Sequence, residues 1–383
     1  MIPPPDAPSP FSTFQTSDAL IPTAALRGWV FDLFRAAGAS AHESELAAGH
    51  LVEANLTGHD SHGVGMVPRY VAALRAGELR LGQTIDCVTD AGSLLVIDGC
   101  GGLGQSVGHQ AMAMAIERTR QQGCVVMALR NAHHLGRIGH WAEQAIAAGL
   151  ASVHFTNVVN SQPSVAPHGG ARARFVTNPF TVGLPVPGAE PLVLDFATSA
   201  VAQGKVRVAY NRGERLPAGS LIDARGRETD DPSVLFEPQD GRLGALRTMA
   251  AHKGSALAIT CELLAGALSG GSTMQPGSAL PKAAIWNNML AIVFDPERLG
   301  TGQSFESQAR EFIDWVKSSP ASADQPEADI LTPGEAERRS RARRARAIPI
   351  DRETLRQLDQ ASAEVSGRFG QSPGPASALE RGC

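Results

Sequence analysis

Gly58-His59-Asp60-Ser61-His62-Gly63-Val64-Gly65-Met66-Val67-Pro68-Arg69-Tyr70 is the stretch around which we interpret the rest of the chain. It follows an apolar helical run and combines two histidines, an aspartate, a serine and three glycines. Glycines weaken a helix and buried polar groups need partners, so this mixture suits neither a helix interior nor a core. We therefore interpret it as an active-site turn in which His62 transfers a proton, because imidazole changes its charge near neutral pH.

The composition is that of a globular protein. The chain has 383 residues, enough for one large or two ordinary domains, with 43% hydrophobic and 19% charged residues. A net charge of −4 argues against nucleic acid or an anionic membrane as the main partner. No apolar run approaches the roughly 20 residues that span a bilayer, and the first residues lack the features of a signal peptide. Five scattered cysteines without CxxC spacing predict reduced thiols in a cytoplasmic protein.

Helical patterns occupy both ends of the chain. Residues 1–20, rich in proline, serine and threonine, are predicted to be a mobile arm. Apolar residues at helical spacing follow in residues 21–84, where Gly77 is placed to end a helix, and again in residues 300–365. We expect these two segments to form one helical domain and residues 366–383 to be a disordered tail.

The region between them, residues 85–299, alternates strand-like and helical runs and predicts a mixed α/β (α+β) domain. The expected strands are residues 93–97, 124–129, 151–155, 180–184, 192–195 and 289–294, with helices at 106–121, 138–148 and 254–268.

One glycine-rich run, Gly99-Cys100-Gly101-Gly102-Leu103-Gly104, fits the GxGxxG pattern between a strand and a helix. A Rossmann site would also need an acidic residue about 20 positions on, at the end of the second strand, to hold the ribose. That strand ends in Leu129-Arg130-Asn131, without a carboxylate. A structural glycine-rich turn therefore explains the run at least as well as a dinucleotide loop does.

A second polar cluster, residues 131–141, lies where a strand passes into a helix. Open α/β sheets bind ligands at such points, and free backbone N–H groups with Arg137 would suit a phosphate or carboxylate. The alternative is a structural turn in which backbone carbonyls satisfy His133 and His134.

Two further positions leave two interpretations open. Asp195 closes an apolar strand, where it could hold His62 in its productive tautomer or cap the next helix. His252 and Lys253 open an apolar helix, where they could bind an anion or lie on a solvated first turn.

Other chemistries find less support. The histidines form no HExxH pattern and have no acidic cluster beside them, so no metal site is expected, and the GxSxG of a serine hydrolase is missing. The arginine run of residues 338–346 could bind nucleic acid, but without interleaved aromatic residues a solvated helix face or an interface fits better.

Taken together, these stretches resemble the malate/L-lactate dehydrogenase 2 family of NAD(P)-dependent 2-oxo acid reductases. Several blocks follow in the family's order over about residues 25–350. They are residues 58–70, 131–141, 177–180, 195–199, 252–254, 262–271 and 331–335.

The resemblance implies a non-Rossmann dehydrogenase that carries NAD or NADP on a large mixed, mostly antiparallel sheet. It also implies a helical domain built from both chain ends, and a homodimer with the site near the dimer interface. The family's proton donor and acceptor maps onto His62, with Ser61 and Asp195 as relay partners. The implied cofactor contacts are His62, His134, Gly136, Arg137, Ile138, Thr177, Asn178, Leu194, Asp195, Phe196, Ala197, Thr198, His252, Lys253, Asn287, Gly334 and Glu335.

Two positions depart from the family pattern. Many members have an arginine four residues after the active-site histidine, suited to a substrate carboxylate, whereas this chain has Met66. Arg69 and Arg137 are then the candidates for that carboxylate, and an apolar wall at Met66 would admit bulkier 2-oxo acids. Val176 stands where glycine is usual, which keeps the backbone farther from the cofactor.

We therefore expect reversible hydride transfer between NAD(P)H and C2 of a 2-oxo acid, with His62 exchanging a proton with the C2 oxygen. Within the family the alternatives are a malate/L-lactate dehydrogenase or a reductase of cyclic imino acids such as piperideine- or pyrroline-2-carboxylate. From other classes, the rivals are a non-catalytic binding protein and, more distantly, a metal-dependent hydrolase.

Overall fold

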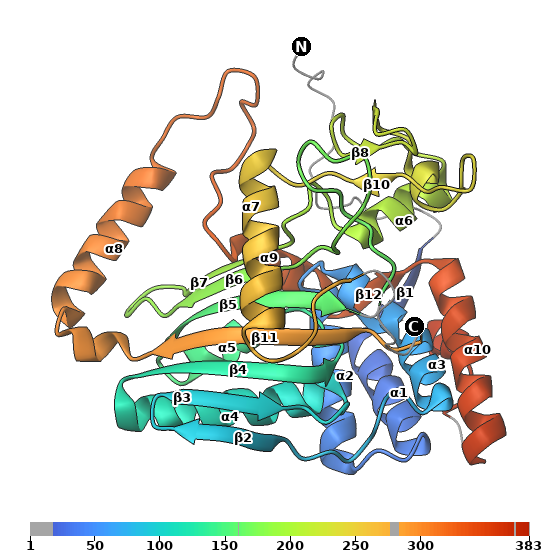
Figure 1. Ribbon diagram of the computed structural model, residues 1–383, viewed down its shortest axis with the longest axis horizontal. Helices are drawn as coiled ribbons and strands as arrows, with labels where there is room; N and C mark the ends of the chain where they lie inside the picture. The colour runs from blue at the N-terminus through green and yellow to red at the C-terminus, as the bar shows by residue number, and fades with distance from the viewer. Residues whose placement is uncertain (1–17, 160, 276–282, 371–372, 383) are drawn as a thin grey trace.

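The computed structural model describes residues 18–159, 161–275, 283–370 and 373–382. A seven-stranded sheet lies at its centre, in the order β2-β3-β4-β11-β5-β6-β7 (Figure 1). The strands are β2 (Asp86–Ala91), β3 (Leu94–Asp98), β4 (Cys124–His133), β5 (Ala151–Val159), β6 (Phe180–Leu184), β7 (Leu192–Phe196) and β11 (Trp286–Phe294). Only β3 and β4 run parallel, which confirms the predicted mixed, mostly antiparallel sheet.

The apolar runs predicted as strands do form strands, and several of these are longer than predicted because they pair with a neighbouring strand. Trp286, the first residue of β11, pairs with His133 of β4 on one side and with Val159 of β5 on the other. Because they pair with this central strand, β4 and β5 extend past the predicted residues 129 and 155 and include polar residues at their C-terminal ends. Strand β2 was missed because most of its residues are exposed, so it has no apolar run.

The two faces of the sheet differ in chemistry. Helices α4 (Gly104–Gln122) and α5 (Gly139–Ala147) share an apolar core with alternate residues of the strands, such as Met289 and Ala291. Asn288, which precedes Met289, points to the opposite face, as the two-residue period of a strand requires. There it meets Asn157, which is hydrogen-bonded to Glu262 at the turn between α7 (His252–Cys261) and the π-helical η4 (Glu262–Ala267).

A helical cluster at one end of the sheet joins both ends of the described chain (Figure 1). Strand β1 (Ala19–Pro22) pairs with β12 (Ala347–Ile350), and helices from both halves share one core that includes Phe34 and Leu358. Its helices are α1 (Thr23–Ala36), α2 (Ala41–Leu56), α3 (Val67–Ala76), α10 (Arg352–Phe369) and the short η6 (Ala376–Gly382), and α9 (Glu335–Arg344) packs against α2. Gly77 ends α3 in the left-handed conformation, as predicted.

Three expectations about the chain ends need correction. Residues 19 and 20 belong to β1 rather than to a mobile arm, because β12 pairs with them; residues 1–17 lie outside the described part. The predicted disordered tail instead contains the end of α10 and η6. It is held by contacts such as the hydrogen bond from Trp29 Nε1 to the Gly374 carbonyl, 3.0 Å long.

Helix α8 (Gly302–Lys317), preceded by the short η5 (Pro296–Leu299), is the third correction, because it does not join the helical cluster. It projects beyond the edge of the sheet (orange in Figure 1), with Phe312 and Trp315 exposed. The C-terminal segment therefore rejoins the helices at α9 rather than at residue 300.

A small lobe between β7 and α7 lies on the α7 side of the sheet (Figure 1). It contains α6 (Gln203–Arg212), η3 (Pro232–Leu235) and a three-stranded sheet of β8 (Leu221–Ile222), β9 (Glu228–Thr229) and β10 (Ala245–Leu246). Throughout the described residues, the helices are too short or too polar to cross a membrane.

Candidate active site

The histidine turn consists of two short 3-10 helices, η1 (Asp60–His62) and η2 (Val64–Met66), between α2 and α3. Asn55, near the end of α2, holds both: its Oδ1 accepts from the Val64 N–H at 2.8 Å, and its Nδ2 donates to Asp60 Oδ1 at 2.7 Å. Arg344 of α9 donates to the same Asp60 oxygen at 2.7 Å. The turn is thus fixed from the N-terminal and C-terminal sides at once.

His62 is half-buried in this turn, and its Nδ1 is hydrogen-bonded to Ser61 Oγ at 2.9 Å. The start of α6 lies directly against Ser61, because a Cβ added to Gly204 would overlap the serine Cβ. The small lobe therefore contacts the Ser61–His62 pair through Gly204.

On its other side, the His62 ring is stacked with His134, with ring centroids 5.6 Å apart and planes inclined by 16°. His134 Nδ1 is hydrogen-bonded to the hydroxyl of Tyr70 at 2.7 Å, and Gln105 donates to that hydroxyl at 3.0 Å. Sequence reasoning assigned no role to Tyr70 or Gln105. Tyr70 lies at a core position of a helix, and nothing in the chain order indicates its contact with His134.

Asp195 behaves differently from both interpretations of its position. Its carboxylate accepts from the Gly139 N–H and from the Thr181 hydroxyl, each at 2.8 Å. It therefore caps the N-terminus of α5 rather than the next helix, α6. Among the described residues no hydrogen bond joins it to His62, so its influence there is electrostatic.

Arg137 lies between these groups with its side chain almost fully buried. Its Nη2 pairs with Glu143, whereas Nε and Nη1 have no hydrogen-bond partner within the described chain. A Cβ at Gly139 would lie 2.6 Å from Arg137 Nη1 and 2.7 Å from Asp195 Oδ2, so both side chains pack directly against this glycine. Unpartnered guanidinium N–H groups are donors of the kind that bind a phosphate or a carboxylate. The residues present thus fit an anionic ligand such as a dinucleotide or an oxo acid.

The electrostatic surroundings keep His62 neutral. Burial is the largest influence and lowers the pKa of His62 to about 4. The neighbouring His59 and Arg137 also lower this pKa, whereas the Asp195 carboxylate raises it. At neutral pH the ring is therefore uncharged and can accept a proton.

Several predicted cofactor contacts use their side chains within the protein. Asn178 bonds Val158, Ala258 and Glu262, and Asn287 bridges the Leu135 N–H and the Asn157 carbonyl. The Thr198 hydroxyl donates to the Thr177 and Asn178 carbonyls, and Glu335 is bound by Lys317, Thr332 and Arg339. The side chains at these positions thus help to hold the protein's own structure together.

The remaining predicted contacts take different places. Ile138 is buried in the core, and Gly136 lies directly against His50, whose Nε2 accepts from the Arg137 N–H at 3.0 Å. Phe196 packs on Phe180 within the sheet. Leu194 is exposed, and Ala197 directly follows β7. Gly334 directly precedes α9 and packs against Val193 of β7.

The residues predicted to bind the substrate differ in burial. Met66 is half-buried against the helical core. Arg69 is exposed on α3 and makes no ion pair with any described residue, but it lies close enough to His133 and His134 to lower the pKa of each. The structural alternative for residues 131–141 fails for His133, because both of its buried ring nitrogens lack a partner within the described chain.

The glycine run at residues 99–104 serves packing. The N–H groups of Gly99, Cys100, Gly101 and Gly102 donate to neighbouring protein oxygens, and a Cβ at Gly104 would overlap the His134 carbonyl. These amides are therefore not free to bind a pyrophosphate.

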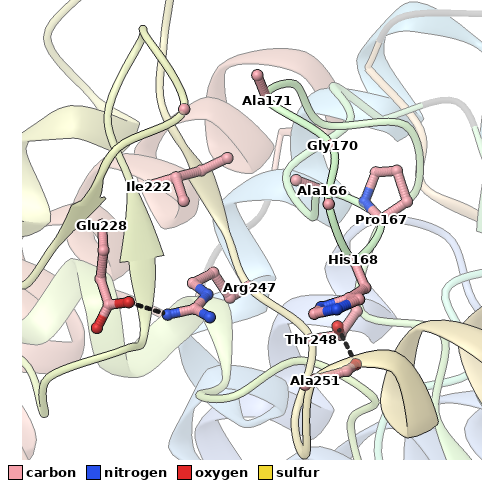
Figure 2. A pocket seen from close by; sticks show the side chains of 12 residues that line it. Ala166, Pro167, His168, Gly170, Ala171, Ile222, Glu228, Arg247, Thr248 and Ala251 are labelled. Carbon is pink, nitrogen blue, oxygen red and sulfur yellow. Dashed lines mark hydrogen bonds and ion pairs between the residues drawn. The ribbon is translucent and has the colours of Figure 1, made fainter.

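His252 and Lys253 are the first residues of α7. Just before them, the Met249 N–H donates to the carbonyl of Thr198, which lies in the segment after β7. Beside this helix end lies a pocket of ≈ 290 Å³ between residues 166–171 and the small three-stranded sheet (Figure 2). Arg247 in the pocket is paired with Glu228 at 2.6 Å. The pocket is thus close to charge-neutral.

The arginine run forms α9 and the turn after it, and four of its six arginines form ion pairs inside the chain. Arg339 pairs with Asp329 and Glu335, Arg341 with Glu53, and Arg344 with Asp60. These pairs hold α9 against the rest of the chain. No cluster of three or more metal-ligating side chains occurs in the described ranges.

Comparison with known proteins places the chain among dehydrogenases. A family model described as malate/L-lactate dehydrogenase matches residues 21–359. Hydroxycarboxylate dehydrogenase B of Escherichia coli K12 is 44% identical over 89% of this chain and 92% of its own length. L-lactate dehydrogenase of Cupriavidus necator is 40% identical over 88% of this chain and 95% of its own. The crystal structure of delta1-piperideine-2-carboxylate reductase from Pseudomonas syringae pv. tomato is similar with a TM-score of 0.76, at 30% identity, over 89% of this chain and 99% of that one.

Proposed function

Because the chain belongs to the malate/L-lactate dehydrogenase family, as the sequence predicted, we propose that it is an NAD(P)-dependent 2-hydroxycarboxylate dehydrogenase that also works as a 2-oxo acid reductase. The observation that carries this proposal is one cluster of side chains. A neutral His62 bonded to Ser61 lies within electrostatic reach of Asp195 and of the Arg137 guanidinium, whose Nε and Nη1 have no partner in the described chain. An acid–base group beside an anion site is what a hydroxy acid requires.

When bound, a nicotinamide dinucleotide supplies or accepts the hydride at C2. In oxidation, the unprotonated Nε2 of His62 removes the proton of the C2 hydroxyl; in reduction, the ring gives a proton to the C2 oxygen as negative charge develops there. Ser61 can stay bonded to Nδ1 in either tautomer, because a hydroxyl both donates and accepts. The negative charge of the bound acid raises the pKa of His62, which makes the protonated ring accessible for reduction.

For the substrate carboxylate, Arg137 is better placed than Arg69. Its Nε and Nη1 are buried and unpartnered, and its charge lowers the pKa of His62, so the two side chains are close. Met66, half-buried where many family members carry an arginine, supplies an apolar wall and supports an acid with a bulky side chain.

The dinucleotide is proposed to lie on the mixed sheet without a Rossmann loop. The amides of residues 99–102 are already hydrogen-bonded, whereas Arg137, packed against Gly139, has N–H groups without a partner in the described chain. The cofactor would then be held by the ends of β4 and β7 and the turns beside them, with the helical cluster closing one side.

We also propose that two copies of the chain form a homodimer in the cytoplasm. Exposed apolar side chains on α7, η4 and α8 support an interface, among them Leu263, Phe312 and Trp315. Cys87, Cys100, Cys124 and Cys261 are free thiols, which supports a reducing compartment.

A panel of 2-oxo acids followed at the NADH absorbance, with NADH and NADPH in parallel, tests the activity. We expect oxidation of at least one coenzyme, with phenylpyruvate turned over at least as well as pyruvate because of Met66. Turnover of piperideine-2-carboxylate alone would replace the proposal with imine reduction. Failure of both coenzymes to bind or react would overturn it in favour of a binding protein.

A further inference from the structure

Tyr70, Gln105 and His134 form a buried hydrogen-bonded group under the His62 ring. They come from α3, α4 and the segment after β4, and the side chains of Tyr70 and Gln105 are almost completely buried. The Tyr70 oxygen lies 2.7 Å from His134 Nδ1, and Gln105 Nε2 lies 3.0 Å from the Tyr70 oxygen and 3.3 Å from the His134 carbonyl oxygen. Nothing in the proton transfer described above uses this group.

The chemistry of these three atoms determines where each proton lies. The His134 carbonyl can only accept, so the Gln105 atom facing it is the amide nitrogen, whose second hydrogen points to the Tyr70 oxygen. The single hydroxyl proton of Tyr70 is then available to His134 Nδ1 at 2.7 Å.

The opposite arrangement leaves this proton poorly bonded. If His134 Nδ1 carried a proton, the Tyr70 hydroxyl could donate only to the His134 carbonyl, 3.4 Å away. Hydroxyl donors usually lie about 2.5–3.0 Å from their acceptors, so that contact is weak. His134 Nδ1 therefore accepts, and the ring proton is on Nε2.

From this geometry we propose that Tyr70 and Gln105 are positioning residues that hold His134 as the neutral Nε2–H tautomer, a hydrogen-bond donor to the bound oxo acid beside His62. This inference rests on the function proposed above. His134 Nε2 makes no hydrogen bond with any described residue and is not among the sealed, unpartnered atoms, so it is open toward the site. Stacking on His62 places the two rings side by side.

The arrangement divides two tasks between two similar rings. His62 exchanges its proton with the substrate, whereas His134 keeps its proton and stabilises the charge that develops on oxygen. Burial is the largest influence that keeps the pKa of His134 well below its usual value, with His62, His133 and Arg69 adding to it, so the ring stays neutral. Its donor capacity is then independent of pH across the working range.

The test is to read the tautomer directly, in the full-length protein labelled with 15N-histidine. Long-range 1H–15N spectra separate Nδ1–H, Nε2–H and doubly protonated rings, and a His134→Gln variant identifies the signal. We expect Nε2–H in the wild type at pH 7. In Tyr70→Phe, which keeps the ring packing, Nδ1–H should appear, and kcat should fall about 10-fold or more while KM for the coenzyme stays within twofold.

Gln105→Leu gives a second route to the same result, because it frees the His134 carbonyl to accept from Tyr70. Phe34→Leu is the matched control: Phe34 packs edge-on against Tyr70, with centroids 6.3 Å apart, and has no polar atom that could bond its hydroxyl. It should lower stability and leave the tautomer unchanged.

A wild-type His134 that carries its proton on Nδ1, or that is doubly protonated at pH 7, overturns the inference. So does a Tyr70→Phe variant with unchanged tautomer and kcat. The spectra need no substrate, so a failure of 2-oxo acid reduction would count against the proposed function instead.

Discussion

At the scale of single residues, the position of His62 depends on what lies against Ser61. Ser61 Oγ is hydrogen-bonded to His62 Nδ1 at 2.9 Å, and Gly204 of α6 leaves room for the serine only because it has no Cβ. The small lobe thus supports the ring that we propose to transfer the proton, through the contact of Gly204 with Ser61.

Gly204→Ala should therefore lower kcat although alanine favours a helix. The added methyl group would push Ser61 away from His62, and a displacement of about 1 Å can cost about 100-fold in rate. Steady-state kinetics should show a loss of ~10-fold or more. The matched control is Gly28→Ala in α1, where a Cβ meets nothing within 4 Å: it should leave kcat unchanged and stabilise the protein by about 0.5–1 kcal/mol. Wild-type kcat in Gly204→Ala would contradict this role of the contact.

At the scale of elements, α9 acts as a brace for the histidine turn. Arg344 is buried and donates to the Asn55 carbonyl and to Asp60, at 2.6 and 2.7 Å. These bonds join the end of α9 to the end of α2 and the start of η1. Arg344 of the arginine run is thus explained by contacts inside the chain.

Arg344→Met should destabilise the protein by about 1–3 kcal/mol, because the buried Asn55 carbonyl loses a charged donor. We also expect kcat to fall, since Asp60 would be held by Asn55 alone. Urea unfolding and steady-state kinetics measure the two effects. Arg343→Met, at the exposed neighbouring position, is the control and should change neither. Equal behaviour of the two variants would refute the brace.

The limits of sequence prediction also lie at this scale. Residues 180–184 were predicted as a strand and form β6 with the same bounds, because an apolar run bounded by proline on both sides carries its own signal. Residues 203–212 carry no apolar periodicity strong enough to mark α6. The turn at His62 could be found from its composition. Its partner Tyr70–Gln105–His134 could not, since these residues meet only after α3 and α4 pack around the end of β4.

At the scale of the whole molecule, the buried histidines make stability depend on pH. Burial lowers the pKa of a set of rings that stay neutral in the native state. They are His50, His62, His133, His134, His140 and His154. In the unfolded chain the same side chains take up protons below about pH 6.5.

The free energy of unfolding should therefore be highest above about pH 7 and fall as the pH drops from about 6.5 toward 4. Each ring that protonates only in the unfolded state contributes up to about 1.4 kcal/mol per pH unit. Urea titrations at pH 8, 7, 6 and 5 should show midpoints that decline steeply below pH 6.5. A midpoint that stays constant between pH 7 and 5 would contradict the burial of these neutral rings.

The second prediction at this scale concerns assembly. Phe312 and Trp315 on α8 are 61% and 72% exposed and lie with ring centroids 6.2 Å apart, a large apolar surface for a single copy. Sedimentation should find about twice the chain mass of 40.1 kDa for the wild type. A Phe312→Ser/Trp315→Ser variant should shift toward one copy, and Val88→Ser, at an exposed apolar position on β2, should not. A monomeric wild type would overturn the proposed homodimer.

The most direct measurement compares wild-type protein with His62→Gln in two assays: coenzyme binding by NADH fluorescence and turnover of the best 2-oxo acid. Proton transfer by a positioned group contributes about 100- to 10,000-fold in rate, so turnover should fall by at least ~100-fold while NADH affinity stays within about threefold. Turnover close to that of the wild type would show that another group exchanges the proton.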